Sequence, residues 1–122
     1  NADVPFKLDG YELSRESGQD QLSISLTEGA RVMSISGKGA GVVESFVDAM
    51  RQVTNKPILL IEYSEHALSN SASAQAIAYI QLSVDGQRFG GSATSSDIVD
   101  ASFKAILSAI NRSQSQVQSE VA

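Results

Sequence analysis

The feature that most constrains the fold of this chain is a repeated pattern, in which a glycine-rich segment leads into an amphipathic helix. The first copy runs through Gly37, Gly39 and Gly41 into apolar residues spaced by three and four positions. The second copy runs from Gly90 and Gly91 into a similar stripe about half a chain later. Two such units on one short chain are expected to stack about a pseudo-twofold axis, with a ligand groove between them.

The length and composition predict one domain. A chain of 122 residues, 42% of them hydrophobic, can bury a single core. The net charge of −5 and the scattered Lys and Arg residues argue against nucleic acid and against an anionic membrane as partners. No apolar run approaches the ~18 residues of a membrane span. Nothing at the start resembles a signal peptide, so we expect a cytoplasmic location.

The first half of the chain predicts three strands followed by a helix. Alternating apolar residues indicate strands near 7–14, 21–27 and 31–36. Apolar residues at steps of three and four then indicate a helix over about 42–54, with one face on a sheet. Pro57 follows and ends the helix, because proline disfavours helical geometry for the residue before it.

The second half repeats this order. A buried strand is predicted over 58–63, followed by a loop over 67–73. A long alternating strand begins at Ala74 and carries one face of small side chains. Asp85-Gly86 is typical of a hairpin turn, and Arg88 begins the returning strand.

The last helix begins at Ser96 or Asp97, whose side chain accepts a hydrogen bond from a free helix amide. The fold class is therefore α+β, with two βββα units related by a pseudo-twofold axis and helices packed on antiparallel sheets. We divide the chain into a leader (1–5), a first unit (6–55), a second unit (56–112) and a flexible tail (113–122).

Neither catalytic residues nor metal ligands are predicted in this chain. His66 is the only histidine and there is no cysteine, so a zinc site lacks its usual three or four ligands. A Ser-His-Asp triad is not supported, because the sequence contains no Gly-x-Ser-x-Gly nucleophile elbow. The glycines before the first helix resemble a phosphate cradle, but no Walker lysine follows them. They either allow a tight turn with close packing or expose helix amides to an anionic group such as a carboxylate.

Four segments, taken together, resemble one family. They are Tyr63–Ser69, Ala74–Ile80, Ser96–Ser102 and Ala109–Arg112. This ordered set is similar to the carboxy-terminal regulatory domain of the 2-isopropylmalate synthases, over about Phe6–Arg112. The resemblance implies a homodimer that binds L-leucine between units as a feedback inhibitor. It also implies a separate (β/α)8 catalytic domain, absent here, that condenses acetyl-CoA with 2-oxoisovalerate and holds the divalent metal.

The resemblance also implies a leucine site. Val43, Leu60 and Ile98 would surround the isobutyl group, while Ala67 and Ala74 would leave room for it. Glu44 would either offset the helix dipole or pair with the ligand ammonium group. The full set of implied leucine-binding residues is Ala40, Val43, Glu44, Leu60, Tyr63, Ala67, Ala74 and Ile98.

One departure from the family concerns the glycine-rich turn. The family commonly reads Gly-Asn-Gly-Pro where this chain has Gly39-Ala40-Gly41-Val42. Ala40 offers no side-chain hydrogen bond, so leucine binding is expected to be weakened. Two alternatives therefore remain: the regulatory domain of a related citramalate synthase that senses isoleucine, or a dimerisation module whose pocket has lost its ligand. An ACT-like fold is disfavoured, because three predicted strands precede each helix.

Overall fold

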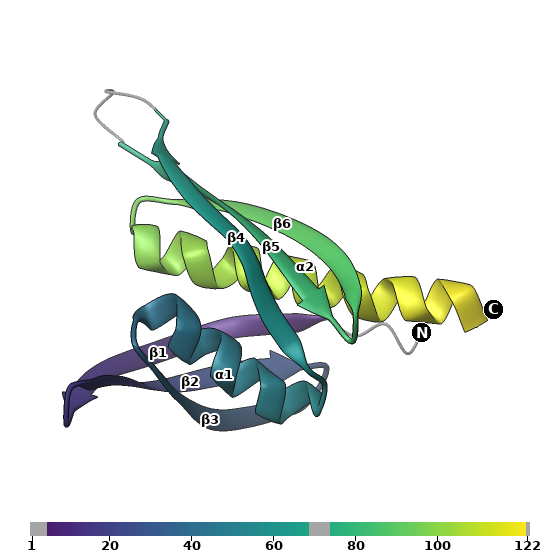
Figure 1. Cartoon of the computed structure of the whole chain (residues 1–122), viewed down its shortest axis with the longest axis horizontal. Coiled ribbons are helices and arrows are strands. Elements are labelled where there is room, and N and C mark those ends of the chain that lie inside the picture. The colour runs from purple at the N-terminus through teal and green to yellow at the C-terminus, as the bar shows by residue number, and fades with distance from the viewer. Residues whose placement is uncertain (1–4, 69–73, 122) are drawn as a thin grey trace.

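The computed structural model describes residues 5–68 and 74–121, with side chains to residue 115. Three strands precede each of two helices, so the predicted α+β class with two βββα units is confirmed (Figure 1). The elements are β1 (Phe6–Glu16), β2 (Gln19–Glu28), β3 (Arg31–Gly39), α1 (Val42–Thr54), β4 (Ile58–Ala67), β5 (Ala76–Val84), β6 (Gln87–Ser95) and α2 (Ile98–Val121).

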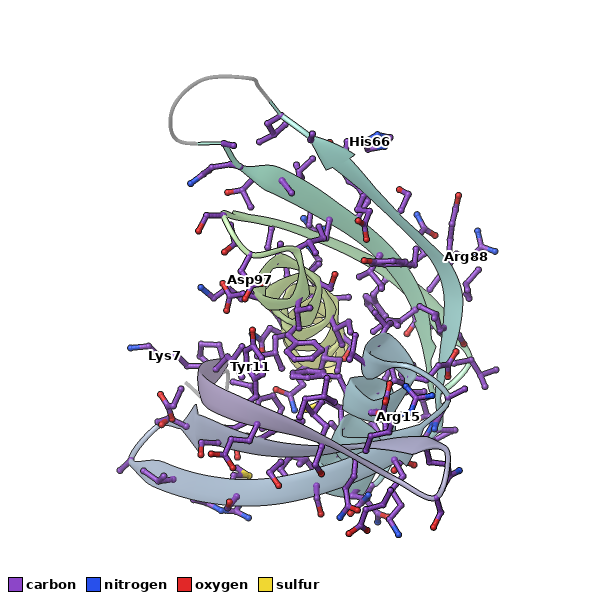
Figure 2. All side chains as sticks on the ribbon, turned by 90° about the vertical axis from the view of Figure 1, so that its left-hand side faces the viewer. Lys7, Tyr11, Arg15, His66, Arg88 and Asp97 are labelled. Carbon is purple, nitrogen blue, oxygen red and sulfur yellow. The ribbon has the colours of Figure 1, made fainter. Side chains whose placement is uncertain are left out.

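Each unit forms its own antiparallel sheet, with strand order β1-β2-β3 in the first and β4-β5-β6 in the second. The two helices lie between the two sheets, as Figures 1 and 2 show together. The apolar residues of the central strands face these helices, because every second residue of β2 and β5 is buried. The buried residues of these strands are Leu22, Ile24, Leu26, Ala78, Ile80, Leu82 and Val84. Neither helix, within the described residues, is long and apolar enough to span a bilayer.

Aromatic contacts join the two units at the centre of the core. Phe46 of α1 stacks on Phe103 of α2, with ring centroids 4.4 Å apart. Tyr11 of β1 meets the same Phe103 ring edge to face at 4.8 Å. Both helices point their amino ends toward the same end of the molecule (Figure 1). The first turns of α1 and α2 therefore lie close to each other.

The internal repeat extends to a strand irregularity. A register shift lies between Leu8 and Gly10 in β1, and another lies between Leu60 and Glu62 in β4. Each shift begins at the third residue of its strand, so the two sheets bend at equivalent points. Tyr11 and Tyr63 follow at the sixth position of their strands and are therefore counterparts.

The glycines that suggested turns are largely strand residues, which corrects that part of the sequence interpretation. Gly37 lies in β3, and Gly90 and Gly91 lie in β6. A Cβ atom at Gly37 would lie 2.1 Å from a carbonyl oxygen of α1, and one at Gly91 would lie 2.2 Å from a carbonyl oxygen of α2. These two glycines let each helix pack directly on the backbone of its own sheet.

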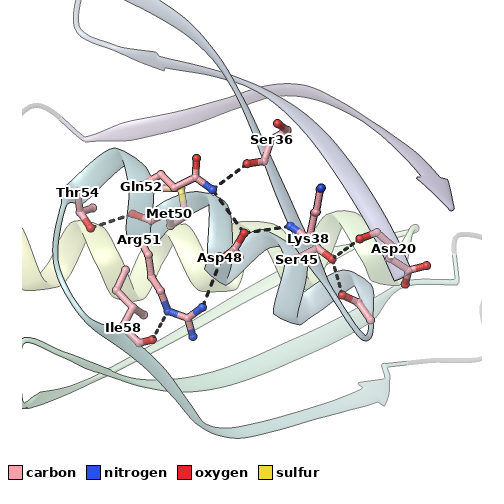
Figure 3. A network of polar contacts seen from close by, with 11 residues as sticks. Asp20, Ser36, Lys38, Ser45, Asp48, Met50, Arg51, Gln52, Thr54 and Ile58 are labelled. Carbon is pink, nitrogen blue, oxygen red and sulfur yellow. Dashed lines mark hydrogen bonds and ion pairs between the residues drawn. The ribbon is translucent and has the colours of Figure 1, made fainter. Parts of the chain in front are cut away.

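Side chains of α1 also hold it to β3 and to the start of β4 through polar contacts (Figure 3). Asp48 accepts a hydrogen bond from the backbone N–H of Lys38 at 3.0 Å. Gln52 donates to the carbonyl of Ser36 at 3.0 Å, and Arg51 donates to the carbonyl of Ile58 at 2.8 Å. The helix is therefore fixed in rotation as well as in height above the sheet.

Some predicted boundaries were too short. The strand predicted over 58–63 continues to Ala67, and β6 continues to Ser95. The loop predicted over 67–73 therefore begins after Ala67, and its residues 69–73 lie outside the described part of the chain. A flexible tail was expected over 113–122; the backbone of α2 is helical to Val121, and the flexibility of this segment stays a prediction. Serine and glutamine, which fill this segment, are compatible with a helix.

Candidate functional site

The amino end of α1 has free backbone amides. Its N-cap is Gly41, in an extended conformation and without a side-chain capping bond. The Ser45 N–H and hydroxyl both donate to the Gly41 carbonyl, at 3.0 and 2.8 Å. The first turn therefore presents unpaired N–H groups and the positive end of the helix dipole. Gly39 keeps the entering strand close, because a Cβ there would lie 2.9 Å from the Cβ of Glu44.

The amino end of α2 already holds a carboxylate. Asp97 accepts a hydrogen bond from the Val99 N–H at 3.0 Å, as predicted for a capping residue. Its other oxygen accepts from the Tyr11 hydroxyl at 3.2 Å. Burial, and then the negative charge of Asp97, raise the pKa of Tyr11 above its ordinary value. Of the two helix ends, the α1 end is therefore the one left open to an external anion.

Tyr63 connects β4 to the first turns of α2. Its hydroxyl lies 2.8 Å from the Ser102 hydroxyl, which donates to the Ile98 carbonyl at 2.8 Å. The same tyrosine donates a short hydrogen bond to Glu65. Burial is the largest cause that raises the pKa of Tyr63, followed by the bond to Glu65. Two of the predicted site residues, Tyr63 and Ile98, therefore lie near each other.

The other predicted residues fall into three places. Val43 and Glu44 are in the first turn of α1 next to Ala40, beside the amino end of α2. Ala67 and Ala74 flank the far end of the β4–β5 hairpin, which lies at the same end of the molecule (Figure 1).

Leu60 lies apart from the end of the hairpin. It is seven residues from Ala67 on one strand, a separation of about 20 Å, which exceeds the length of a leucine. A single ligand in one chain cannot touch both residues.

Exposure divides the predicted set. Four of its members are half-buried and pack on the core, and four are exposed. The half-buried ones are Val43, Leu60, Tyr63 and Ile98, and the exposed ones are Ala40, Glu44, Ala67 and Ala74. Three surface hollows, with volumes of about 710, 320 and 210 Å³, are lined by other residues. The predicted set is therefore not enclosed in one chain, and its residues line none of these three hollows.

Sequence reasoning missed the contribution of Tyr11. It lies on the opposite sheet from Tyr63, yet both hydroxyl groups reach α2. The signal was the repeat itself, because Tyr11 and Tyr63 are separated by the same 52 residues as Leu8 and Leu60. A comparison of the two halves position by position would have found the pair.

No group of three or more His, Cys, Asp or Glu side chains in the described part of the chain is placed to hold a metal ion. The exposed His66 ring lies edge to face with Tyr79, with centroids 6.0 Å apart. This contact is an aromatic pair on the outer face of the second sheet (Figure 2).

The sequence comparison decides the family. Residues 1–114 match the family described as the LeuA allosteric (dimerisation) domain. The chain belongs to this family. The match includes both βββα units and the residues at both helix ends.

Full-length relatives carry the name 2-isopropylmalate synthase. The chain is 38% identical to that of Leifsonia xyli over 109 residues, which cover 88% of this chain and 18% of the relative. It is 34% identical to that of Pseudomonas fluorescens over 125 residues, which cover 99% of this chain and 22% of the relative. It is 40% identical to that of Thermobifida fusca over 99 residues, which cover 81% of this chain and 17% of the relative. The chain therefore spans about a fifth of these proteins and corresponds to their carboxy-terminal domain.

Proposed function

We propose that this chain is the allosteric domain of a 2-isopropylmalate synthase, where it binds L-leucine for feedback inhibition and forms a homodimer. The observation that carries the proposal is the open amino end of α1, beside half-buried apolar side chains, in a member of the LeuA allosteric domain family. The catalytic reaction, the condensation of acetyl-CoA with 2-oxoisovalerate by a domain that holds a divalent metal, would belong to the remainder of the polypeptide. We expect the enzyme to act in the cytoplasm.

The proposed binding mode assigns each part of leucine to a feature of the site. The ligand carboxylate accepts hydrogen bonds from the first amides of α1, where the helix dipole favours an anion. The isobutyl group packs near Val43 and Ile98, and burial of such a group contributes about 1.5–3 kcal/mol. Glu44, an acidic residue of the same turn, would attract the ammonium group. The α2 end takes no ligand carboxylate, because Asp97 occupies it.

A second copy of the chain would close the site. Ala40, Glu44, Ala67 and Ala74 are exposed in one chain, although a buried ligand requires contact on all sides. Leu60, which is too far from Ala67 to share a ligand with it in one chain, could meet the ligand of a partner. A pocket shared between two copies would also couple leucine binding to the subunit arrangement, which inhibition of a distant catalytic domain requires.

A thermal-shift titration of the 122-residue chain tests the proposal. Leucine at 100 times its Kd should stabilise the folded state by about 2.7 kcal/mol and raise the melting temperature. Isoleucine and valine serve as matched comparisons. A larger shift with isoleucine would support a citramalate synthase regulator instead, whereas no shift with any branched amino acid would contradict the leucine site.

A bulky substitution at the hairpin end tests the position of the site. Ala74→Trp should abolish the leucine shift, because the large side chain would fill the room that Ala74 is proposed to leave for the ligand. Ala74 is exposed, so the change should not disturb the core. Ser83→Trp, on the outer face of the same sheet, is the control. Equal leucine shifts in both variants would mean that Ala74 does not contact the ligand.

One observation favours a second candidate, a dimerisation module that no longer binds an amino acid. Ala40 lacks the side-chain amide that the family carries in this turn, and a lost hydrogen bond of this kind costs about 1–3 kcal/mol. Restoring it separates the candidates. Ala40→Asn should strengthen leucine binding by about five-fold or more if the pocket is functional, and should change nothing if the pocket is degenerate.

A further inference from the structure

A long groove runs between the middle of α2 and the start of β1, and none of the predicted leucine-binding residues lines it. Its volume is about 710 Å³. The residues that line it are Pro5, Phe6, Lys7, Leu8, Lys104, Leu107, Ser108, Asn111, Arg112, Gln114 and Ser115. From Lys104 to Ser115 the helix rises about 16 Å. The groove is therefore much longer than a free amino acid.

The lining of the groove is apolar at its base and basic at its edges. Phe6 and Leu107 are almost fully buried. Lys7, Lys104 and Arg112 supply three of the chain's nine basic residues, and no acidic residue lines the groove in the part of the chain whose side chains are described. Lys104 forms an ion pair with Asp100 at 3.0 Å. Neither Lys7 nor Arg112 takes part in an ion pair among the described residues. Although the chain has a net charge of −5, the basic and apolar side chains of this groove suit an acidic partner that also carries apolar side chains.

The groove lies where the polypeptide enters the domain. Asn111 of α2 accepts a hydrogen bond from the Phe6 N–H at 2.8 Å and donates to the Phe6 carbonyl at 3.1 Å. This pair of bonds fixes the start of β1 against α2, with Pro5 and Phe6 as one wall of the groove. Residues that precede this point in a longer polypeptide therefore begin beside the groove. A tethered segment has a high effective concentration, so a shallow site is sufficient to hold it.

We propose that this groove holds an acidic segment with apolar side chains from the part of the same polypeptide that precedes residue 1. The inference rests on the proposal that this chain is one domain of a longer synthase, and it does not depend on leucine binding. A second copy that used the same groove would place like charges face to face across a twofold axis, which disfavours that occupant. The docked segment would connect α2, whose amino end adjoins the leucine site, to the rest of the enzyme.

Hydrogen–deuterium exchange of the full-length polypeptide, without leucine, tests the proposal. Amides of residues 107–115 should exchange at least ten-fold more slowly in the full-length protein than in the 122-residue chain. The double variant Lys7→Glu with Arg112→Glu should remove this difference, because it reverses two charges of the groove. The control, Lys56→Glu with Arg88→Glu, makes the same change of net charge away from the groove and should keep the slow exchange.

Three outcomes would overturn the proposal. Equal exchange in the two proteins would mean that no preceding segment covers the groove. Slow exchange that survives the groove variant would mean that the occupant is not recognised by charge. If exchange in the 122-residue chain becomes slower as the protein concentration rises, the occupant of the groove is a second copy of the chain. The leucine thermal shift of the 122-residue chain is measured separately, so failure of the leucine site and failure of the groove can be distinguished.

Discussion

Two tyrosines occupy equivalent positions in the repeated units but use their hydroxyl groups differently. Tyr11 donates to the carboxylate that caps α2, whereas Tyr63 meets Ser102 one turn further along the same helix. Both hydroxyl groups are therefore bound to α2, one from each sheet. Small changes in the position of this helix would alter both contacts.

Removal of the Tyr63 hydroxyl should destabilise the domain modestly. Tyr63→Phe removes the contact with Ser102 and the bond to Glu65, a loss of about 1 kcal/mol, because one lost hydrogen bond typically costs this amount. Urea unfolding would measure the change. Tyr79→Phe is the control, because Tyr79 is exposed. Equal stability of the two variants would mean that the Tyr63 contacts contribute nothing.

The same residue predicts a pH dependence. Burial raises the pKa of Tyr63 above its ordinary value of 10.0 in the folded state. The phenol therefore keeps its proton more firmly in the folded state than in the unfolded state. The contribution of this group to the free energy of unfolding is complete below about pH 10 and is lost as pH rises through the folded pKa. The free energy of unfolding of the wild type should fall between about pH 9 and about pH 11 more steeply than that of Tyr63→Phe. Parallel curves would contradict the raised pKa.

The cap of α2 gives a third prediction at this scale. Asp97→Ala should destabilise the chain by about 1 kcal/mol, because the Val99 amide and the Tyr11 hydroxyl both lose their acceptor. Asp97→Asn keeps an acceptor for the helix amide and should cost less. Thermal unfolding of the two variants compares them. An equal loss of stability in the two variants would mean that the negative charge of Asp97 causes the effect and that its capping hydrogen bond contributes nothing.

At the scale of elements, the distance between each helix and its sheet is set by a glycine. Gly37 and Gly91 sit in the last strand of each unit, directly beneath a carbonyl group of the following helix. The sequence predicted the strands and helices of both units from apolar spacing together with turn, proline and capping signals. It could not predict this use of the glycines, because a glycine before a helix is equally typical of a turn and spacing contains no information about helix height.

Gly91→Ala should therefore be costly for a reason that secondary-structure propensity does not predict. The added Cβ would lie 2.2 Å from the Ala105 carbonyl oxygen, so α2 must move away from its sheet. Overpacking of this kind typically costs about 1–3 kcal/mol. Gly10→Ala is the matched control, because no atom lies within 4 Å of a Cβ at that strand position. Urea midpoints that fall equally in both variants would refute the packing role of Gly91.

At the scale of the whole molecule, the two units bring both helix amino ends to one end of the domain. The resemblance to the family named the candidate site residues, and the structure places Val43, Tyr63 and Ile98 around these helix ends. Leu60 lies too far along β4 to join Ala67 in one chain. Sequence reasoning did not detect this separation, because it ended the strand at residue 63 and placed Ala67 in a loop, whereas β4 is extended from Ile58 to Ala67.

This geometry links the proposed leucine site to self-association. If the exposed residues of the site meet a second copy of the chain, leucine binds the dimer more tightly than the monomer, and by thermodynamic linkage it must then strengthen the dimer. Sedimentation velocity of the 122-residue chain, at several concentrations with and without leucine, measures the dimer dissociation constant. We expect leucine to lower this constant by five-fold or more, for a coupling of about 1 kcal/mol. Ala74→Trp should dimerise without this response, and an unchanged constant in the wild type at saturating leucine would mean that each chain binds its ligand alone.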